Sequence, residues 1–87
     1  MALKSDVFSS SGAIAGGGML LKMLEVTPKG GSLEIRLLIG TDSSGTEKYR
    51  IRANESSEFR DFGEGLTING PVYAYFYEGE GAITVLT

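Results

Sequence analysis

Residues 32–39 read Ser32-Leu33-Glu34-Ile35-Arg36-Leu37-Leu38-Ile39, and this stretch decides the fold class. Up to Leu37 its apolar residues alternate with polar ones, which is the period-two pattern of a strand with one buried face. Leu38 interrupts the polar side and indicates partial cover there. The same alternation recurs at residues 48–53, 66–69, 72–77 and 83–85.

Residues 19–26 are also expected to form a strand, although their composition suits a helix as well. Gly18 before them and Pro28 after them leave room for fewer than about three helical turns. Glycine, proline, asparagine and aspartate separate the strand-like segments, which follow one another roughly every 8–12 residues. The pattern predicts an all-β fold, a small antiparallel β-sandwich or barrel, as a single domain over residues 19–87.

Residues 1–18 differ in composition from the rest of the chain. Ser9-Ser10-Ser11-Gly12 and Gly16-Gly17-Gly18 flank Ala13-Ile14-Ala15, and such serine- and glycine-rich sequence leaves the backbone free. We therefore expect a flexible N-terminal arm over residues 1–18. Its apolar residues Val7, Phe8 and Ile14 are the candidate anchor points on a neighbouring molecule.

Composition narrows the function classes. The 87 residues include no cysteine and no histidine, so a disulfide is excluded and the usual zinc and Ser-His or Cys-His sites have no ligands or base. The net charge of -3 argues against nucleic acid as a partner, because such proteins usually carry a basic excess. The longest strongly apolar run, Met19-Leu20-Leu21, is far short of a membrane helix. We expect no cofactor, and a chain this small favours association with other chains.

Three motifs resemble known sites but have simpler interpretations. The glycines at residues 12–18 lack the lysine and hydroxyl that a phosphate loop needs. The loop from Asp42 to Glu47 has too few acids for a dedicated calcium site. The acids between Glu55 and Glu64 surround Arg60 and are expected to be surface charge rather than paired catalytic carboxylates. The sequence thus predicts neither catalytic nor metal-binding residues, and no enzyme.

Two strand faces remain as candidate binding surfaces. Lys48, Arg50 and Arg52 form a basic stripe that could contact phosphate or an acidic partner. The simpler interpretation, which we favour, is that it pairs with Glu34 or another acid on a neighbouring strand. Tyr73, Tyr75 and Tyr77 share one face of their strand, opposite an apolar face. That strand is either central in a sandwich, with the tyrosines reaching the rim, or its tyrosine side meets another subunit. A platform for carbohydrate stacking is a third interpretation.

The pattern resembles small structural proteins of tailed bacteriophages. The resemblance lies in the entry at residues 16–22, the turn at residues 28–32, the strand at residues 70–75 and the closing hairpin at residues 79–85. It implies a non-enzymatic virion component made in the host cytoplasm, most simply a capsid decoration or cement subunit that binds a capsid or other virion protein as a homo-oligomer. A tail or fibre part and a small carbohydrate-binding β module are the alternatives. The predicted partner interface comprises Val7, Phe8, Ile14, Tyr73, Tyr75 and Tyr77.

Overall fold

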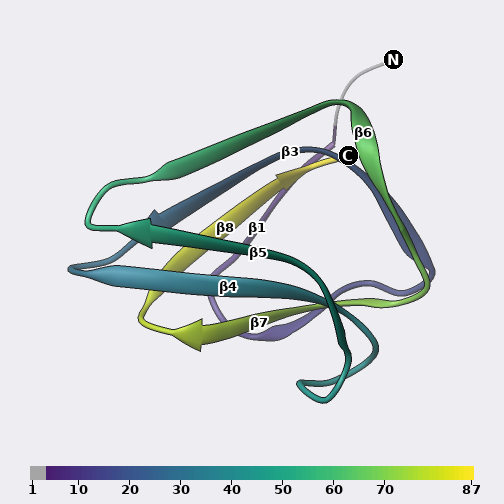
Figure 1. Cartoon of the computed structure of the whole chain (residues 1–87), viewed down its shortest axis with the longest axis horizontal. Helices are drawn as coiled ribbons and strands as arrows, with labels where there is room; N and C mark the ends of the chain where they lie inside the picture. The colour runs from purple at the N-terminus through teal and green to yellow at the C-terminus, as the bar shows by residue number, and fades with distance from the viewer. Residues whose placement is uncertain (1–3) are drawn as a thin grey trace.

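Two four-stranded sheets pack face to face in the computed structural model, which describes residues 4–87. The strands are β1 (Ser5–Phe8), β2 (Gly12–Ala15), β3 (Gly18–Pro28), β4 (Ser32–Ile39), β5 (Thr46–Asn54), β6 (Glu58–Asn69), β7 (Val72–Glu78) and β8 (Gly81–Leu86). Sheet 1 has the order β1-β8-β3-β6 and sheet 2 the order β2-β7-β4-β5, with every pairing antiparallel (Figure 1). The predicted all-β fold is confirmed in its sandwich form. Residues 4–87 include no helix that could cross a membrane.

The core lies between the sheets and follows from the alternation in sequence. On β4 the side chains of Leu33, Ile35 and Leu37 are fully buried, and on β7 so are those of Val72 and Ala74. These residues face inward because successive side chains of a strand point to opposite sides. Sheet 1 supplies the other half of the core. Its fully or almost fully buried residues are Leu21, Leu24, Val26, Ile68, Ile83 and Val85.

The chain crosses between the sheets at almost every connection. In sequence order the eight strands of residues 4–87 alternate between sheet 1 and sheet 2, and only β4 and β5 follow one another within the same sheet. The C-terminal strand β8 is internal, since it pairs with β1 on one side and with β3 on the other. Each sheet therefore contains segments from both ends of the chain.

The N-terminal region forms part of both sheets and is not a free arm where the structure describes it. Residues Ser5–Phe8 pair with β8, and residues Gly12–Ala15 pair with β7. The Ser11 hydroxyl also accepts a hydrogen bond from the amide of Phe76 at 2.9 Å. This differs from the flexible arm expected for residues 1–18, because backbone pairing at a sheet edge outweighs the low strand propensity of serine and glycine. The first three residues of that expected arm lie outside the described part.

Strand β6 extends eight residues further toward the N-terminus than the alternation at residues 66–69 predicted. Between Asp61 and Leu66 the four residues 62–65 of β6 face a single residue of β3, Lys22, so β6 bulges away from β3 there. The Lys22 ammonium donates a hydrogen bond of 2.7 Å to the carbonyl of Glu64 in this bulge. Gly63, with a φ of 62°, provides the left-handed conformation that the bulge needs.

Candidate functional site

The outer side of sheet 2 gathers aromatic and charged side chains from three neighbouring strands. Inward-facing residues of β7, β4 and β5 are buried in the core, so the alternate residues face outward. We call this surface the tyrosine face. Its members are Tyr73, Tyr75, Tyr77, Glu34, Arg36, Leu38, Glu47, Lys48, Arg50, Arg52 and Glu78.

The strand register brings these side chains together in two rows. Arg36 stands opposite Tyr75 on one side and Arg50 on the other. Glu34 stands opposite Glu78 and Arg52 in the same way. Opposed like charges on neighbouring strands destabilise a sheet, so both rows need counter-charges.

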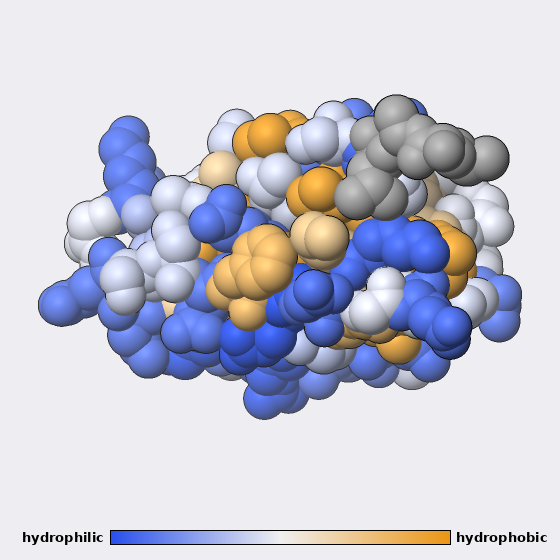
Figure 2. All heavy atoms as spheres, turned by 90° about the horizontal axis from the view of Figure 1, so that it is seen from above, coloured by the Kyte–Doolittle hydropathy of each residue, from blue (hydrophilic) through white to orange (hydrophobic). Residues whose placement is uncertain are grey.

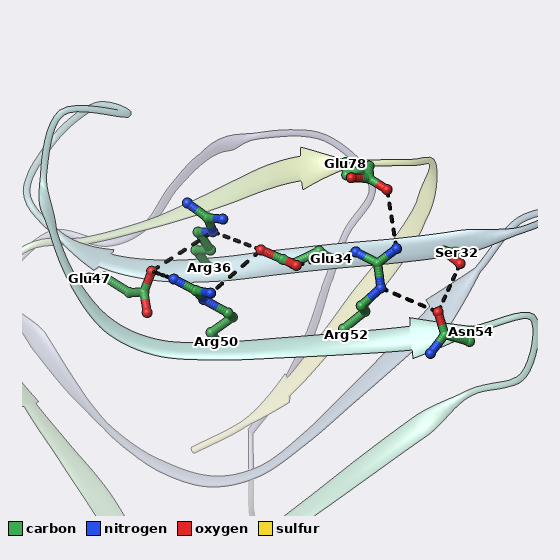
Figure 3. Close-up of polar contacts among 8 residues, drawn as sticks. All are labelled: Ser32, Glu34, Arg36, Glu47, Arg50, Arg52, Asn54 and Glu78. Carbon is green, nitrogen blue, oxygen red and sulfur yellow. Dashed lines mark hydrogen bonds and ion pairs between the residues drawn. The ribbon is translucent and has the colours of Figure 1, made fainter.

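Glu34 supplies the first counter-charge and is the centre of an ion-pair network (Figure 3). Its carboxylate accepts a hydrogen bond of 2.8 Å from Arg36 Nε and one of 3.3 Å from Arg52. The Nε of Arg50 lies 4.0 Å away. Although the side chain is only 10% exposed, the hydrogen bond from Arg36 lowers the pKa of Glu34, with Arg52 adding to the effect against the cost of burial.

Two further acids complete the network around the arginines. Glu47 lies 2.9 Å from Arg50 and 3.8 Å from Arg36. The β4–β5 register shifts between Leu37 and Leu38, and Glu47 is the residue that pairs with Leu38 after this shift. Glu78 lies 3.2 Å from Arg52. The predicted pairing of the basic stripe with Glu34 is therefore confirmed for Arg50 and Arg52. The network of ion pairs fixes charged side chains along the whole width of the tyrosine face.

The tyrosines are joined to this network through Arg36. The guanidinium of Arg36 lies over the ring of Tyr77, and the Tyr75 and Tyr77 rings meet edge to face with centroids 5.9 Å apart. Tyr77 is nevertheless 49% exposed. Its ring is thus held in place by two neighbours while much of its surface stays open to a partner.

The structure separates the six residues of the predicted partner interface into three places. Tyr73, Tyr75 and Tyr77 lie together on the tyrosine face. Val7, which is 64% exposed, lies on the outer side of sheet 1, because its cross-strand partner there is Thr84. Phe8 and Ile14 are half-buried and pack against the core. The six residues therefore form no single surface, and Phe8 and Ile14 mainly close the sandwich.

Sequence reasoning missed Arg36 as the residue that fixes Tyr77. The two residues are far apart in sequence, and only the β4–β7 pairing, with its irregularity between Glu34 and Ile35, brings them together. β7 is indeed an internal strand with a buried apolar side, as one interpretation held. Its tyrosines lie on the broad outer side of the sheet, however, and not only at a rim.

The remaining candidate sites are engaged in local structure. Asp42 accepts a hydrogen bond of 2.9 Å from the Ser44 amide, and its pKa is lowered by the Ser44 hydroxyl and amide. Glu58 is paired with Arg60 at 2.8 Å. Among the described residues no group of three or more acidic side chains is placed to hold a metal ion. A hollow beside β1, β2 and β3 is lined partly by apolar residues, including Ile14 and Met19. Its two charged residues form an ion pair, with Lys4 Nζ 3.7 Å from Asp6 Oδ2.

The fold and this surface together define an antiparallel β-sandwich with an aromatic and arginine-rich outer face. No protein-family model, curated protein or solved structure matches the chain.

Proposed function

We propose that this protein is a non-enzymatic structural subunit of a virion, a capsid decoration or cement subunit that binds a larger shell through the tyrosine face. The observation that carries the proposal is the half-exposed ring of Tyr77, held between Arg36 and Tyr75 on a broad sheet surface. Tyrosine and arginine are, together with tryptophan, the residue types most enriched at the energetic centres of protein interfaces.

The tyrosine face is organised before any partner arrives. Arg36 is bound by Glu34 at 2.8 Å and stacked on Tyr77, so it loses little conformational freedom when a partner covers it. Tyr77 has only two side-chain torsions to fix. A rigid sheet with such side chains suits a contact that is repeated many times on a regular shell.

The proposal that the protein belongs to a virion depends on the resemblance to small structural proteins of tailed bacteriophages. The turn and strand at Gly70-Pro71-Val72-Tyr73-Ala74-Tyr75, which carry that resemblance, also supply two residues of the tyrosine face. Resemblance and geometry therefore point to the same strand, β7.

The proposal is tested by sedimentation of the native chain with phage particles from an infected host. The wild-type chain is expected to co-sediment with capsids in a saturable way. Tyr77→Ala and Arg36→Ala should reduce the bound fraction about tenfold or more, as central interface residues do. Leu20→Ala, at a 44% exposed position on the other sheet, is the matched control and should bind like wild type.

A folded chain that stays free of particles at every concentration would overturn the proposal. A glycan array is run in parallel. Binding to a glycan that is lost in Tyr77→Ala, without binding to particles, would replace the shell contact by carbohydrate stacking.

A further inference from the structure

The outer side of sheet 1 is a second broad surface with exposed apolar side chains. Cross-strand pairing aligns Val7, Thr84, Glu25 and Phe59 in one row across all four strands. Val7 is 64% exposed and Phe59 is 52% exposed, at the two ends of the row. We call this surface the apolar face. The row beside it contains Ser5, Leu86, Met23 and Asp61.

The two outer faces differ in charge, because acidic residues prevail on the apolar face and basic residues on the tyrosine face. In the two rows of the apolar face the charged residues are Glu25 and Asp61, both acidic. On the tyrosine face four basic residues (Arg36, Lys48, Arg50 and Arg52) stand against three acids (Glu34, Glu47 and Glu78). The side chains of Arg50 and Arg52 are 52% and 41% exposed, although each is paired with one or two of these acids. Figure 2 shows mostly hydrophilic residues along the lower margin and a mixture of hydrophobic and hydrophilic ones above it.

We infer that the apolar face docks on the tyrosine face of a second copy of this chain. Glu25 and Asp61 would face the exposed arginines, and Phe59 and Val7 would be covered by the tyrosine side of the neighbour. Complementary charges steer such an encounter and fix its register. This inference depends on the proposed function, because it names a partner for the same tyrosine face.

The two faces have the dimensions that a stable contact requires. The Cα extents of the molecule are 33 × 30 × 16 Å, and the strands of both sheets run across the view down the shortest axis (Figure 1). Each broad side is therefore large enough to bury the roughly 800 Å² per partner of a standard interface.

Charge also decides between the possible arrangements of two copies. A symmetric contact of two apolar faces would bring Glu25 and Asp61 of one copy against the same acids of the other, and like charges across an interface are strongly unfavourable. A contact between different faces avoids this. Because the two faces lie on opposite sides of the sandwich, each added copy presents a free face to the next, and the copy at one end keeps its tyrosine face uncovered for the shell.

The first test is sedimentation equilibrium of the full chain. The average mass should rise with protein concentration. The association should weaken when salt is raised from about 0.1 M to about 1 M, because the screening length falls from about 10 Å to about 3 Å. A mass that stays at one chain at every concentration and salt overturns the inference.

The second test uses charge reversal on each face. Glu25→Lys and Arg50→Glu should each weaken self-association about tenfold or more, since each places like charges across the contact. Lys48→Glu is an alternative to Arg50→Glu at an exposed position of the same face, should loss of the Arg50–Glu47 pair unfold the chain. Glu80→Lys, in the exposed turn after β7, makes the same charge change away from both faces and should associate like wild type.

Mixing the two charge-reversed chains separates this arrangement from a symmetric one. The reversed faces complement each other, and so do the two unchanged faces, so an equimolar mixture should regain the association that each variant lost alone. No recovery in the mixture, with each variant folded, contradicts the pairing of unlike faces. A wild-type chain that is monomeric yet still binds particles overturns only this inference and leaves the proposed function standing.

Discussion

The guanidinium carbon of Arg36 lies 3.5 Å from the centroid of the Tyr77 ring. The contact joins β4 to β7 on the outside of sheet 2, and the hydrogen bond from Arg36 to Glu34 holds the guanidinium over the ring. A flat, delocalised cation is needed for this stacking, and lysine cannot reproduce it.

The first prediction concerns this pair. Arg36→Lys should destabilise the fold by about 0.5–1 kcal/mol, which is the size of a cation–π contact at a partly exposed site. Tyr77→Phe keeps the ring and should leave stability unchanged. Urea unfolding at equilibrium measures both, and a cycle of Arg36→Lys, Tyr77→Ala and the double variant Arg36→Lys/Tyr77→Ala gives the coupling. Strictly additive losses in that cycle would show that the stacking contributes nothing.

The second prediction concerns acid sensitivity. The Arg36 hydrogen bond holds the pKa of Glu34 below its ordinary value of 4.5. A carboxylate with a lowered pKa in the folded state stabilises the fold above that ordinary value, and the contribution is lost as the pH falls through the folded-state pKa. Glu34→Gln should therefore destabilise the protein by about 1–2 kcal/mol at neutral pH, as expected for lost hydrogen bonds to a charged group.

The measurement is urea unfolding of wild type and Glu34→Gln between about pH 7 and about pH 3, the range in which carboxylates titrate. The difference between the two proteins should shrink as the pH decreases below 4.5. Glu78→Gln is the control at neutral pH, because that side chain is 56% exposed and contacts Arg52 alone among the arginines, and it should match wild type. A constant difference across the whole range would contradict the role of Glu34.

The third prediction concerns the turn between β7 and β8. Gly79 has a φ of 89°, and a Cβ there would overlap the carbonyl oxygen of Ser32. Gly79→Ala should lower the free energy of unfolding by about 2 kcal/mol or more, because backbone strain and a clash with backbone act together. Gly17→Ala is the control, since nothing lies within 4 Å of its added methyl group. Equal thermal midpoints for the two variants would refute this difference.

The fourth prediction concerns the N-terminal strands. Deleting residues 1–16 removes β1 and β2 and leaves the outer edges of β8 and β7 unpaired. We expect a large loss of stability and aggregation through the newly open sheet edges. Thermal unfolding and light scattering detect both. A deletion that melts and scatters like the full chain would show that these strands contribute little, and would return residues 5–15 to the role of a dispensable arm.

The sequence predicted the internal strands well because each has one buried side. Leu33, Ile35 and Leu37 had to alternate with polar residues once one face of β4 was covered by sheet 1. The first half of β6 gave no such signal. At that edge of sheet 1 Glu58 and Arg60 lie on the inward side and pair with each other, while Phe59 faces outward.

The N-terminal strands and the centre of the tyrosine face could not be read from local sequence. The pairing partners of β1 and β2 lie at the other end of the chain, so serine and glycine content was the one signal available locally. The tyrosines themselves were found by their spacing. The contact between Arg36 and Tyr77 depends on the register across an irregular pairing, which composition does not encode.

The internal position of β8 has a consequence for how the molecule is made. Sheet 1 cannot close until this last strand enters between β1 and β3, and almost every strand pairing spans a crossing between the sheets. Folding dominated by such non-local pairing is slow. On the ribosome the apolar sides of the strands already synthesised stay partly uncovered until β8 has left the exit tunnel. The newly made chain is therefore most vulnerable to proteases and most dependent on chaperones in that interval, before sheet 1 and its outer face are complete.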